Sequence, residues 1–248
     1  MRIVLILCFE LLSVPLVAQI VNVEGKRNQL DQEGWHGTVD LNFDLTQNTK
    51  TVLTLGARTN VQFLKGRHRV LLLADADRVA ANGTNLVDRG YNHLRYNFEF
   101  GQKRRLAFEA FNQVQYNSVQ LIQYRHLIGA GLRFSLYQTD SLKLWMGSLP
   151  MFEYEELTTD IVERNVRQSS YLFFFFARKK FEFQTINYYQ PNLADFSDFR
   201  LTTGTTIELG ILRWLRYVST LDLTYDSKPP VEVPNVVFTL KNGIKLEF

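Results

Sequence analysis

Residues 93–100 read HLRYNFEF, a stretch in which polar and apolar residues alternate without a break. The polar set is His93, Arg95, Asn97 and Glu99, and the apolar set is Leu94, Tyr96, Phe98 and Phe100. Because successive side chains of a β-strand point to opposite faces, this stretch predicts a strand with one apolar and one charged face. An apolar outer face in contact with lipid and a polar inner face are typical of strands in a transmembrane barrel.

The same alternation continues on both sides of this stretch and covers most of the chain. It is found at residues 37–45, 53–63, 68–79, 93–100, 106–116, 125–136, 142–154, 166–177, 181–190, 199–209, 215–225 and 236–248. At about 12 residues each, with a rise of about 3.3 Å and a tilt near ~40°, such strands span roughly 30 Å, the thickness of a bilayer core. The predicted fold is therefore all-β, a twelve-stranded antiparallel transmembrane β-barrel over residues 34–248.

The composition agrees with a single folded domain. The 248 residues are 46% hydrophobic and 21% charged, with 14 Gly, 6 Pro and 1 Cys, which excludes a disordered chain, a collagen and a disulfide scaffold. Beyond the first twenty residues, no apolar run approaches the roughly 20 residues of a membrane helix, so a helical membrane protein is excluded. A net charge of only +3 argues against nucleic acid as a partner of an exported barrel.

The first 19 residues are typical of a secretory signal peptide. Arg2 precedes an apolar run at residues 3–17, which only Glu10 interrupts, and the small residue Ala18 follows. The alternative is a buried N-terminal helix or strand. Cys8 lies too early in the run to be a lipoprotein anchor. Removal of the signal peptide would leave a mature chain without cysteine. Residues 20–33 are then a periplasmic N-terminal segment.

The predicted connections alternate in length. Short ones are expected at residues 64–67, 101–104, 138–141, 178–180 and 210–213, and longer ones at 80–88, 157–165, 192–198 and 227–234. An outer-membrane barrel predicts this asymmetry, with short periplasmic turns and longer extracellular loops. The first and fifth connections are short and depart from the rule.

The chain ends in IKLEF at residues 244–248, an alternating stretch that closes on an aromatic residue. This ending is typical of bacterial outer-membrane proteins and indicates the barrel-assembly machinery as a partner. Lipid offers no hydrogen bonds to an open sheet edge, so the strands must close into a barrel. Outer-membrane lipid is the second predicted partner.

Charged residues on the inner face are the candidate site. Short turns predict Asp75 opposite His93 and Arg95 opposite Glu109, with Arg58 and Arg95 one diagonal step from Asp75. The predicted ion-pair network of the enclosed interior, or lumen, comprises Arg58, Asp75, Asp77, His93, Arg95, Glu109, Arg125 and Arg133. Two interpretations stay open: side chains that fill the lumen, or a polar path for a small solute.

Metal binding is a weaker interpretation of the same residues. Asp75 and Asp77 share a face about 7 Å apart and could chelate a hard cation with loop oxygens. Neutralisation by the neighbouring arginines competes with it, and the four histidines come from four segments without zinc-binding spacing. No metal and no cofactor are therefore predicted.

Catalysis is not predicted either. A membrane hydrolase needs a serine near a histidine and a third residue that orients it. His126 falls on the outward face opposite Val114, while Ser118 falls on a loop. His126 suits an interfacial aromatic belt with Tyr116 and Tyr124 better. The chain is accordingly predicted not to be an enzyme.

Two further features have two interpretations each. Residues 171–176, YLFFFF, are apolar on both faces and form either an inward plug with Met151 and Trp145 or a contact with another protein in the membrane. The short turns carry Lys65, Arg67, Lys103, Arg104, Lys179, Lys180 and Arg213. These bases are either solvated or able to bind anionic partners.

Several motifs resemble the salt-induced outer-membrane protein family, which is catalogued as a domain of unknown function. They are Gly34-Trp35, EAFNQVQYN at 109–117, the stretch 125–133 with GAG at 129–131, YYQP at 188–191, DFSDFR at 195–200 and YDSKPP at 225–230. The likeness covers nearly the whole mature chain. It implies a β-barrel in the outer membrane of a Gram-negative bacterium and brings no catalytic residues with it.

The last two motifs lie where strands meet the longer loops. Their charged residues and prolines are Asp195, Asp198, Arg200, Asp226, Pro229 and Pro230. Prolines stiffen loops, so we expect these two connections to pack together as a lid on the outer mouth. An ordered lid argues against an open pore.

Together these features predict a non-enzymatic outer-membrane protein. Its role would be structural in the envelope, or that of an accessory subunit bound to other outer-membrane proteins. A narrow channel for small solutes is the alternative, and an outer-membrane hydrolase is a third, weaker one.

Overall fold

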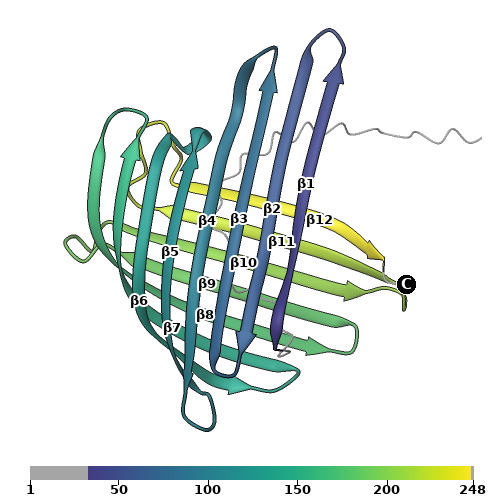
Figure 1. Cartoon of the computed structure of the whole chain (residues 1–248), viewed down its shortest axis with the longest axis vertical. Helices are drawn as coiled ribbons and strands as arrows, with labels where there is room; N and C mark the ends of the chain where they lie inside the picture. Colours follow the sequence, from purple (N-terminus) through teal and green to yellow (C-terminus); the bar gives the residue numbers. More distant parts are fainter. Residues whose placement is uncertain (1–32, 247–248) are drawn as a thin grey trace, which may run out of the picture.

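The computed structural model describes residues 33–246 and shows twelve antiparallel strands in one sheet, ordered from the first strand to the last (Figure 1). The strands are β1 (Gly34–Gln47), β2 (Thr51–Lys65), β3 (His68–Ala81), β4 (Thr84–Phe100), β5 (Leu106–Asn117), β6 (Ile122–Gln138), β7 (Leu142–Leu157), β8 (Val162–Arg178), β9 (Phe181–Pro191), β10 (Phe199–Gly210), β11 (Leu215–Asp226) and β12 (Val236–Leu246). A 3₁₀ turn, η1 (Ser118–Gln120), lies between β5 and β6. The predicted number of strands and their antiparallel order are confirmed.

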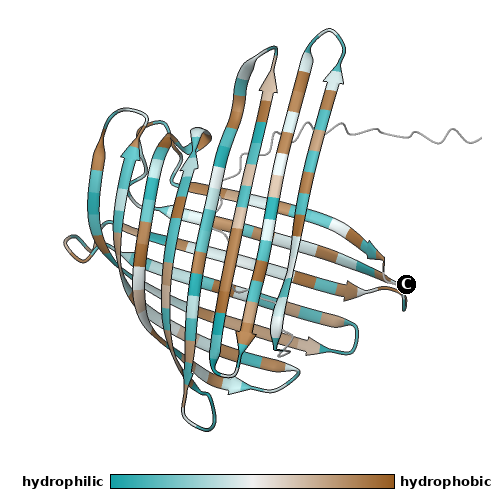
Figure 2. Cartoon of the chain, in the orientation of Figure 1, coloured by the Kyte–Doolittle hydropathy of each residue, from teal (hydrophilic) through white to brown (hydrophobic). Residues whose placement is uncertain are grey.

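The sheet coils strongly, and its last strands cross the direction of its first strands (Figure 1). Apolar and polar residues alternate along the strands, as predicted (Figure 2). On β4 the concave face buries His93, which is 2% exposed, whereas Leu94 on the convex face is 48% exposed. Charged residues are thus buried inside and apolar residues exposed outside, the reverse of a water-soluble domain.

The two edge strands do not pair in this structure. No ladder joins β1 to β12 within residues 33–246, and nearly all of β1 is exposed on both faces. The sheet is therefore a curled, open one. Its interior is nevertheless spanned by contacts between distant strands, since Tyr171 of β8 donates a hydrogen bond to Glu109 of β5.

The connections correct two sequence-based predictions. The long loop expected at residues 80–88 is wrong: β3 and β4 are joined by Asn82 and Gly83 alone, both with positive φ, at 50° and 81°. Asn-Gly with two left-handed residues is the tight turn that suits a twisted hairpin. The loop expected at residues 157–165 is shorter too, because β8 begins at Val162.

Two long connections remain in the described part of the chain, at residues 192–198 and 227–235. They lie at one end of the sheet, which we call the loop end. The hairpins β2–β3, β4–β5, β6–β7, β8–β9 and β10–β11 lie at the opposite end, the turn end, together with Glu33 at the start of β1. This arrangement follows from an antiparallel sheet in sequential order.

The predicted signal peptide, most of the predicted N-terminal segment and the terminal Phe248 lie outside the described residues. Within residues 33–246, no helix is long and apolar enough to cross a membrane.

Candidate functional site

The pairing register differs from the predicted one. Asp75 lies opposite Tyr91, not His93, and Arg95 lies opposite Phe111, not Glu109. The β3–β4 ladder has a bulge between Val79 and Ala80, next to its tight turn. The β4–β5 connection has one residue more than predicted. Both ladders therefore slip by two residues, which keeps every side chain on its predicted face.

The β2–β3 ladder slips for the same kind of reason. Gly66 has φ of +60° and allows a two-residue turn, so Arg58 lies directly opposite Asp75 instead of diagonally. Arg95 lies opposite Leu71, so its predicted position one diagonal step from Asp75 is wrong. Arg58 also approaches Asp77 at 3.8 Å, and Arg89 of β4 binds Asp77 at 2.5 Å.

A buried ion-pair network fills the loop end of the interior. At its centre lies Glu153 of β7, with no exposed surface, and Arg167 Nε lies 2.6 Å from its Oε2. Arg200 of β10 donates to the other oxygen of Glu153 and, at 3.3 Å, to Glu155. Arg125 of β6 binds Glu155 at 2.5 Å. These bonds join the neighbouring strands β6, β7 and β8 to β10, which is not adjacent to any of them in the sheet.

The network continues into the two long loops. Arg167 donates to both carboxylate oxygens of Asp198, at 3.0 and 2.8 Å. Arg200 Nε donates to Asp226 at 2.8 Å. We call this set the loop-end network: Arg125, Glu153, Glu155, Arg167, Asp198, Arg200 and Asp226. Three guanidinium groups meet four carboxylates, so every arginine has a buried counter-charge.

The predicted lid residues are brought together. Ser227 donates its backbone N–H to Phe199 O at 3.0 Å and its hydroxyl to Ser197 O at 2.9 Å, which ties one long loop to the other. Lys228 Nζ lies 2.6 Å from Asp195 Oδ2. Hydrogen bonds from Lys228 and Ser197 lower the pKa of Asp195 to about 2, and the bond to Asp195 raises the pKa of Lys228.

A second polar group lies next to the loop-end network. Arg95 Nη1 lies 2.8 Å from Glu109 Oε1, and Tyr171 donates to the other oxygen of Glu109 at 2.6 Å. His93 accepts from Arg95 Nε at 3.2 Å and contacts Gln113 at 3.1 Å. The predicted partnership of Arg95 with Glu109 is therefore present, reached across a diagonal and not between opposite residues.

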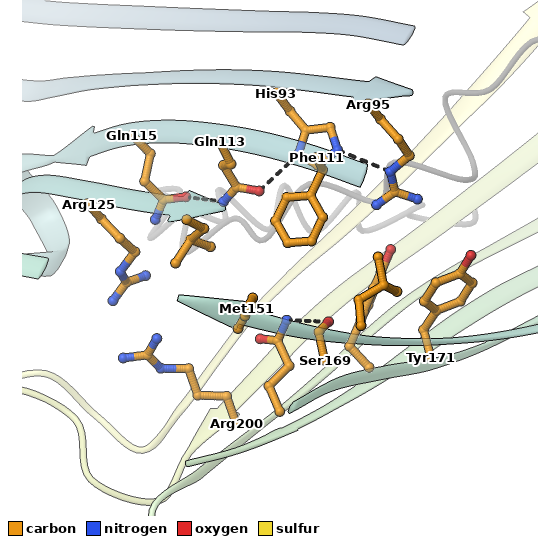
Figure 3. A pocket seen from close by; sticks show the side chains of 14 residues that line it. His93, Arg95, Phe111, Gln113, Gln115, Arg125, Met151, Ser169, Tyr171 and Arg200 are labelled. Atoms are coloured by element: carbon orange, nitrogen blue, oxygen red, sulfur yellow. Dashed lines mark hydrogen bonds between the residues drawn. The ribbon is translucent and has the colours of Figure 1, made fainter. Parts of the chain in front are cut away.

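A small cavity lies between these two groups, and Figure 3 shows side chains that line it. The cavity that His93, Arg95, Arg125 and Arg200 line measures about 40 Å³. A water molecule occupies about 30 Å³ of the liquid and needs at least about 10–15 Å³ of such cavity space, so only a few waters fit. No sugar or nucleotide fits into the interior at this level.

An apolar cluster closes the space beside the cavity. Tyr171, Phe173 and Phe175 of β8 pack with Leu149, Ile186 and Tyr188, and the Phe173 ring stacks on Trp145 at 4.9 Å between centroids. Phe174 lies on the other face against Phe183. The structure thus places the inward half of residues 171–176 in the interior, with Trp145 as predicted and Met151 buried beside the cavity.

The predicted network is divided into separate groups. Arg58, Asp75 and Asp77 lie together, His93, Arg95 and Glu109 form a second group, and Arg125 belongs to the loop-end network. Arg133 is apart from all of them, with Glu99 at 3.6 Å and the ring of Trp145 at 5.1 Å.

Sequence reasoning missed the central members of the loop-end network, Glu153, Glu155 and Arg167. The sequence did contain a signal for the two glutamates. They follow Met151 at every second residue of the strand, so they lie on the same inward face as Met151. Glu155 lies opposite Arg125 on the neighbouring strand β6, but the meeting of both glutamates with Arg200 depends on β10, which comes later in the sequence and is not a neighbour of β7. A single chain without its fold does not reveal that meeting.

The outward histidine His126 has a polar partner on the neighbouring strand. His126 lies opposite Val114, as predicted, and its Nε2 contacts the amide of Asn112 at 2.9 Å. Ser118 begins η1 and donates no bond to His126 in the described contacts. Within residues 33–246, no group of three His, Cys, Asp or Glu could hold a metal ion.

These observations define a class: a twelve-stranded antiparallel sheet with an apolar convex face and a charged, filled interior. A family model described as "Protein of unknown function, DUF481" matches residues 26–241, and the chain belongs to this family. No curated protein matches the chain. The likeness to the salt-induced outer-membrane proteins stays a prediction, since the family description names no role.

One similar solved structure is described as "NanC porin structure in rhombohedral crystal form". Its TM-score to this chain is 0.47 at 9% sequence identity, and the superposition covers 79% of this chain and 94% of that one.

Proposed function

We propose that the chain spans the bacterial outer membrane as a barrel closed between β1 and β12, with its loop end plugged. The buried charges and exposed apolar residues support the membrane part of this proposal, since lipid is the medium that suits this inverted surface. Lipid would also force the two edge strands to pair. Outer-membrane lipid and the assembly machinery are the partners this proposal requires.

The role that best fits a plugged barrel is non-enzymatic, structural or as an accessory subunit of an outer-membrane complex. One observation carries this proposal: the loop-end network crosses the interior and is tied to both long loops. A solute would have to break several buried ion pairs at once, each costly to separate in a low dielectric. The aromatic cluster fills the space beside them.

Conductance in planar bilayers tests the plug. We expect the wild-type protein to give no steady single-channel steps. A triple variant, Glu153→Ser with Arg167→Ser and Arg200→Ser, removes the network and is expected to conduct, with folding checked by heat-dependent gel mobility. Steady steps from the wild type would overturn the plug and support a channel.

The narrow channel remains the second candidate because the largest difference in free space is between the two ends of the interior. A cavity of about 530 Å³ lies at the turn end, more than ten times the space found near the loop end. A movement of the lid and its arginines would be needed to connect it to the outside. The triple variant measures how much conductance such an opening allows.

A further inference from the structure

The turn-end cavity is built from residues that the proposed function does not use. It lies between the start of β1, the β2–β3 and β4–β5 hairpins and the end of β6. Its charged residues are Glu33, Arg69, Glu99, Lys103, Arg104 and Arg105. At about 530 Å³ it has the size of a small-molecule site, which is typically about 300–1,000 Å³.

The charge of this cavity is one-sided. Four cations face two carboxylates, and both carboxylates are already engaged. Glu33 accepts from the backbone N–H of Gly66 at 2.8 Å, and Glu99 has Arg104 at 3.8 Å and Arg133 at 3.6 Å. The loop-end network has the opposite balance, with more carboxylates than guanidinium groups. The surplus of positive charge is therefore local to the turn end.

Hydrogen-bond donors are also in surplus behind this cavity. Asn97, opposite Arg69, and Arg133, which contacts Glu99, are both more than nine-tenths buried. The Nδ2 of Asn97 and the Nη1 of Arg133 have no hydrogen-bond acceptor among the described residues. Neither residue lines the cavity, so the residues that could contact a ligand there are the charged ones named above.

We propose that the turn-end cavity binds a small solute that carries phosphate groups. A phosphate offers two negative charges and several acceptor oxygens, which matches a surplus of two cations. Guanidinium groups recognise it with paired, charge-assisted hydrogen bonds. Arg69 supplies a buried cation at the cavity wall, while Lys103, Arg104 and Arg105 form an exposed rim that a ligand reaches from the turn end.

The site does not depend on conduction, since all the residues that line it lie at the turn end. A plugged barrel could bind the ligand from the periplasmic side without passing it on. The phosphate could belong to a soluble metabolite or to a phospholipid headgroup. Both sources share the same recognition chemistry, and their difference in solubility allows one experiment to separate them.

Calorimetric titration of the full chain in neutral detergent tests the proposal. The probes are pyrophosphate and glycerol phosphate as soluble phosphates, short-chain phosphatidic acid as the lipid, and citrate as a carboxylate of similar charge. The variant Arg104→Gln with Arg105→Gln removes half of the cations that line the cavity. Lys179→Gln with Arg213→Gln removes two charges from other turns at the same end and is the matched control.

We expect pyrophosphate to bind the wild type and the control equally, and at least about tenfold more weakly to the rim variant. Binding of phosphatidic acid alone, with the same loss, would support the site and identify a lipid source. Equal binding to all three proteins, no binding of any phosphate, or citrate binding as tight as pyrophosphate would overturn the proposal.

Discussion

Glu153 shows why single residues matter in this interior. It is completely buried and contacts three guanidinium groups, of Arg125, Arg167 and Arg200. A buried ion pair adds little net stability compared with an apolar replacement, but the loss of one partner leaves a charge uncompensated. The residue therefore acts less as a source of stability than as the group that determines where the three arginines lie.

The variant Glu153→Gln should consequently lower the free energy of unfolding by about 3–5 kcal/mol, because three buried cations lose their shared carboxylate. Glu163→Gln is the control, since Glu163 is exposed and the hydrogen bond that it accepts from Asn165 is long, at 3.4 Å. It should change stability by less than about 0.5 kcal/mol. Urea unfolding in lipid vesicles measures both. Equal effects of the two variants would show that the network is not tightly coupled.

At the scale of strands and loops, the alternation of residues predicted the fold well because it reports directly on the two faces of each strand. Register was predicted less well, since it depends on one or two residues in each turn. The Asn82-Gly83 turn carries a readable hairpin signal. The β4–β5 connection has no comparable signal, so its five residues and the position of Arg95 could not be read from the chain.

The candidate site was predicted in the same uneven way. Each charged residue of the predicted network lies on the inward face where the alternation placed it. A shift of the register by two residues does not change the face on which a side chain lies. Partners across the interior, such as Glu109 with Tyr171, depend on the curvature of the whole sheet. The packing of the two long loops was predictable because charged residues occur in both of them and prolines stiffen residues 227–235.

The two long loops should respond to acid only at very low pH. Asp195 has an ordinary pKa of 3.8, which the hydrogen bonds from Lys228 and Ser197 lower to about 2. A lowered pKa means that the ion pair contributes fully above the ordinary value and is lost as the pH falls through about 2. The loops should therefore stay joined at pH 4 and separate as the pH approaches 2.

Spin labels on Phe196→Cys and Val231→Cys, both exposed in these loops, report that separation as a broadened distance distribution. In the Lys228→Met background we expect the distribution to be broader already at neutral pH. The pH at which the remaining broadening occurs should rise toward the ordinary pKa of aspartate. Broadening of the parent protein near pH 4 would contradict the assigned role of Lys228.

At the scale of the whole molecule, the open edges of β1 and β12 have complementary faces. The residues Val39, Leu41 and Phe43 of β1 and Phe238, Leu240 and Ile244 of β12 are exposed on the convex face. On the concave face β1 carries Asp40 and Asp44, and β12 carries Lys241 and Lys245. Each edge therefore offers lipid-compatible side chains outside and an opposite charge inside.

These charges select one closing register. An antiparallel β1–β12 ladder that places Asp40 opposite Lys245 also places Asp44 opposite Lys241, because both pairs are four residues apart. Following the paired residues from strand to strand around the sheet leads from Gly34 at the start of β1 to Asn235 beside β12. The closing register is offset from this path by about 16 residues, and this offset is the stagger of the barrel. For twelve strands, that stagger gives a tilt of roughly 43°, within the usual range of roughly 35–45° for membrane barrels.

Disulfide cross-linking in outer-membrane vesicles tests this register. With Cys8 replaced by Ser, the pair Asp44→Cys and Lys241→Cys should form a disulfide within the chain in high yield, because directly opposite strand residues lie within bonding distance. The control pair Asp44→Cys and Gly243→Cys keeps the same inward face but shifts the register by two residues, and it should cross-link poorly. A higher yield from the control pair would show another register. Failure of both pairs, with cross-links between chains instead, would show that β1 and β12 pair with neighbouring molecules and that the barrel is not closed by one chain.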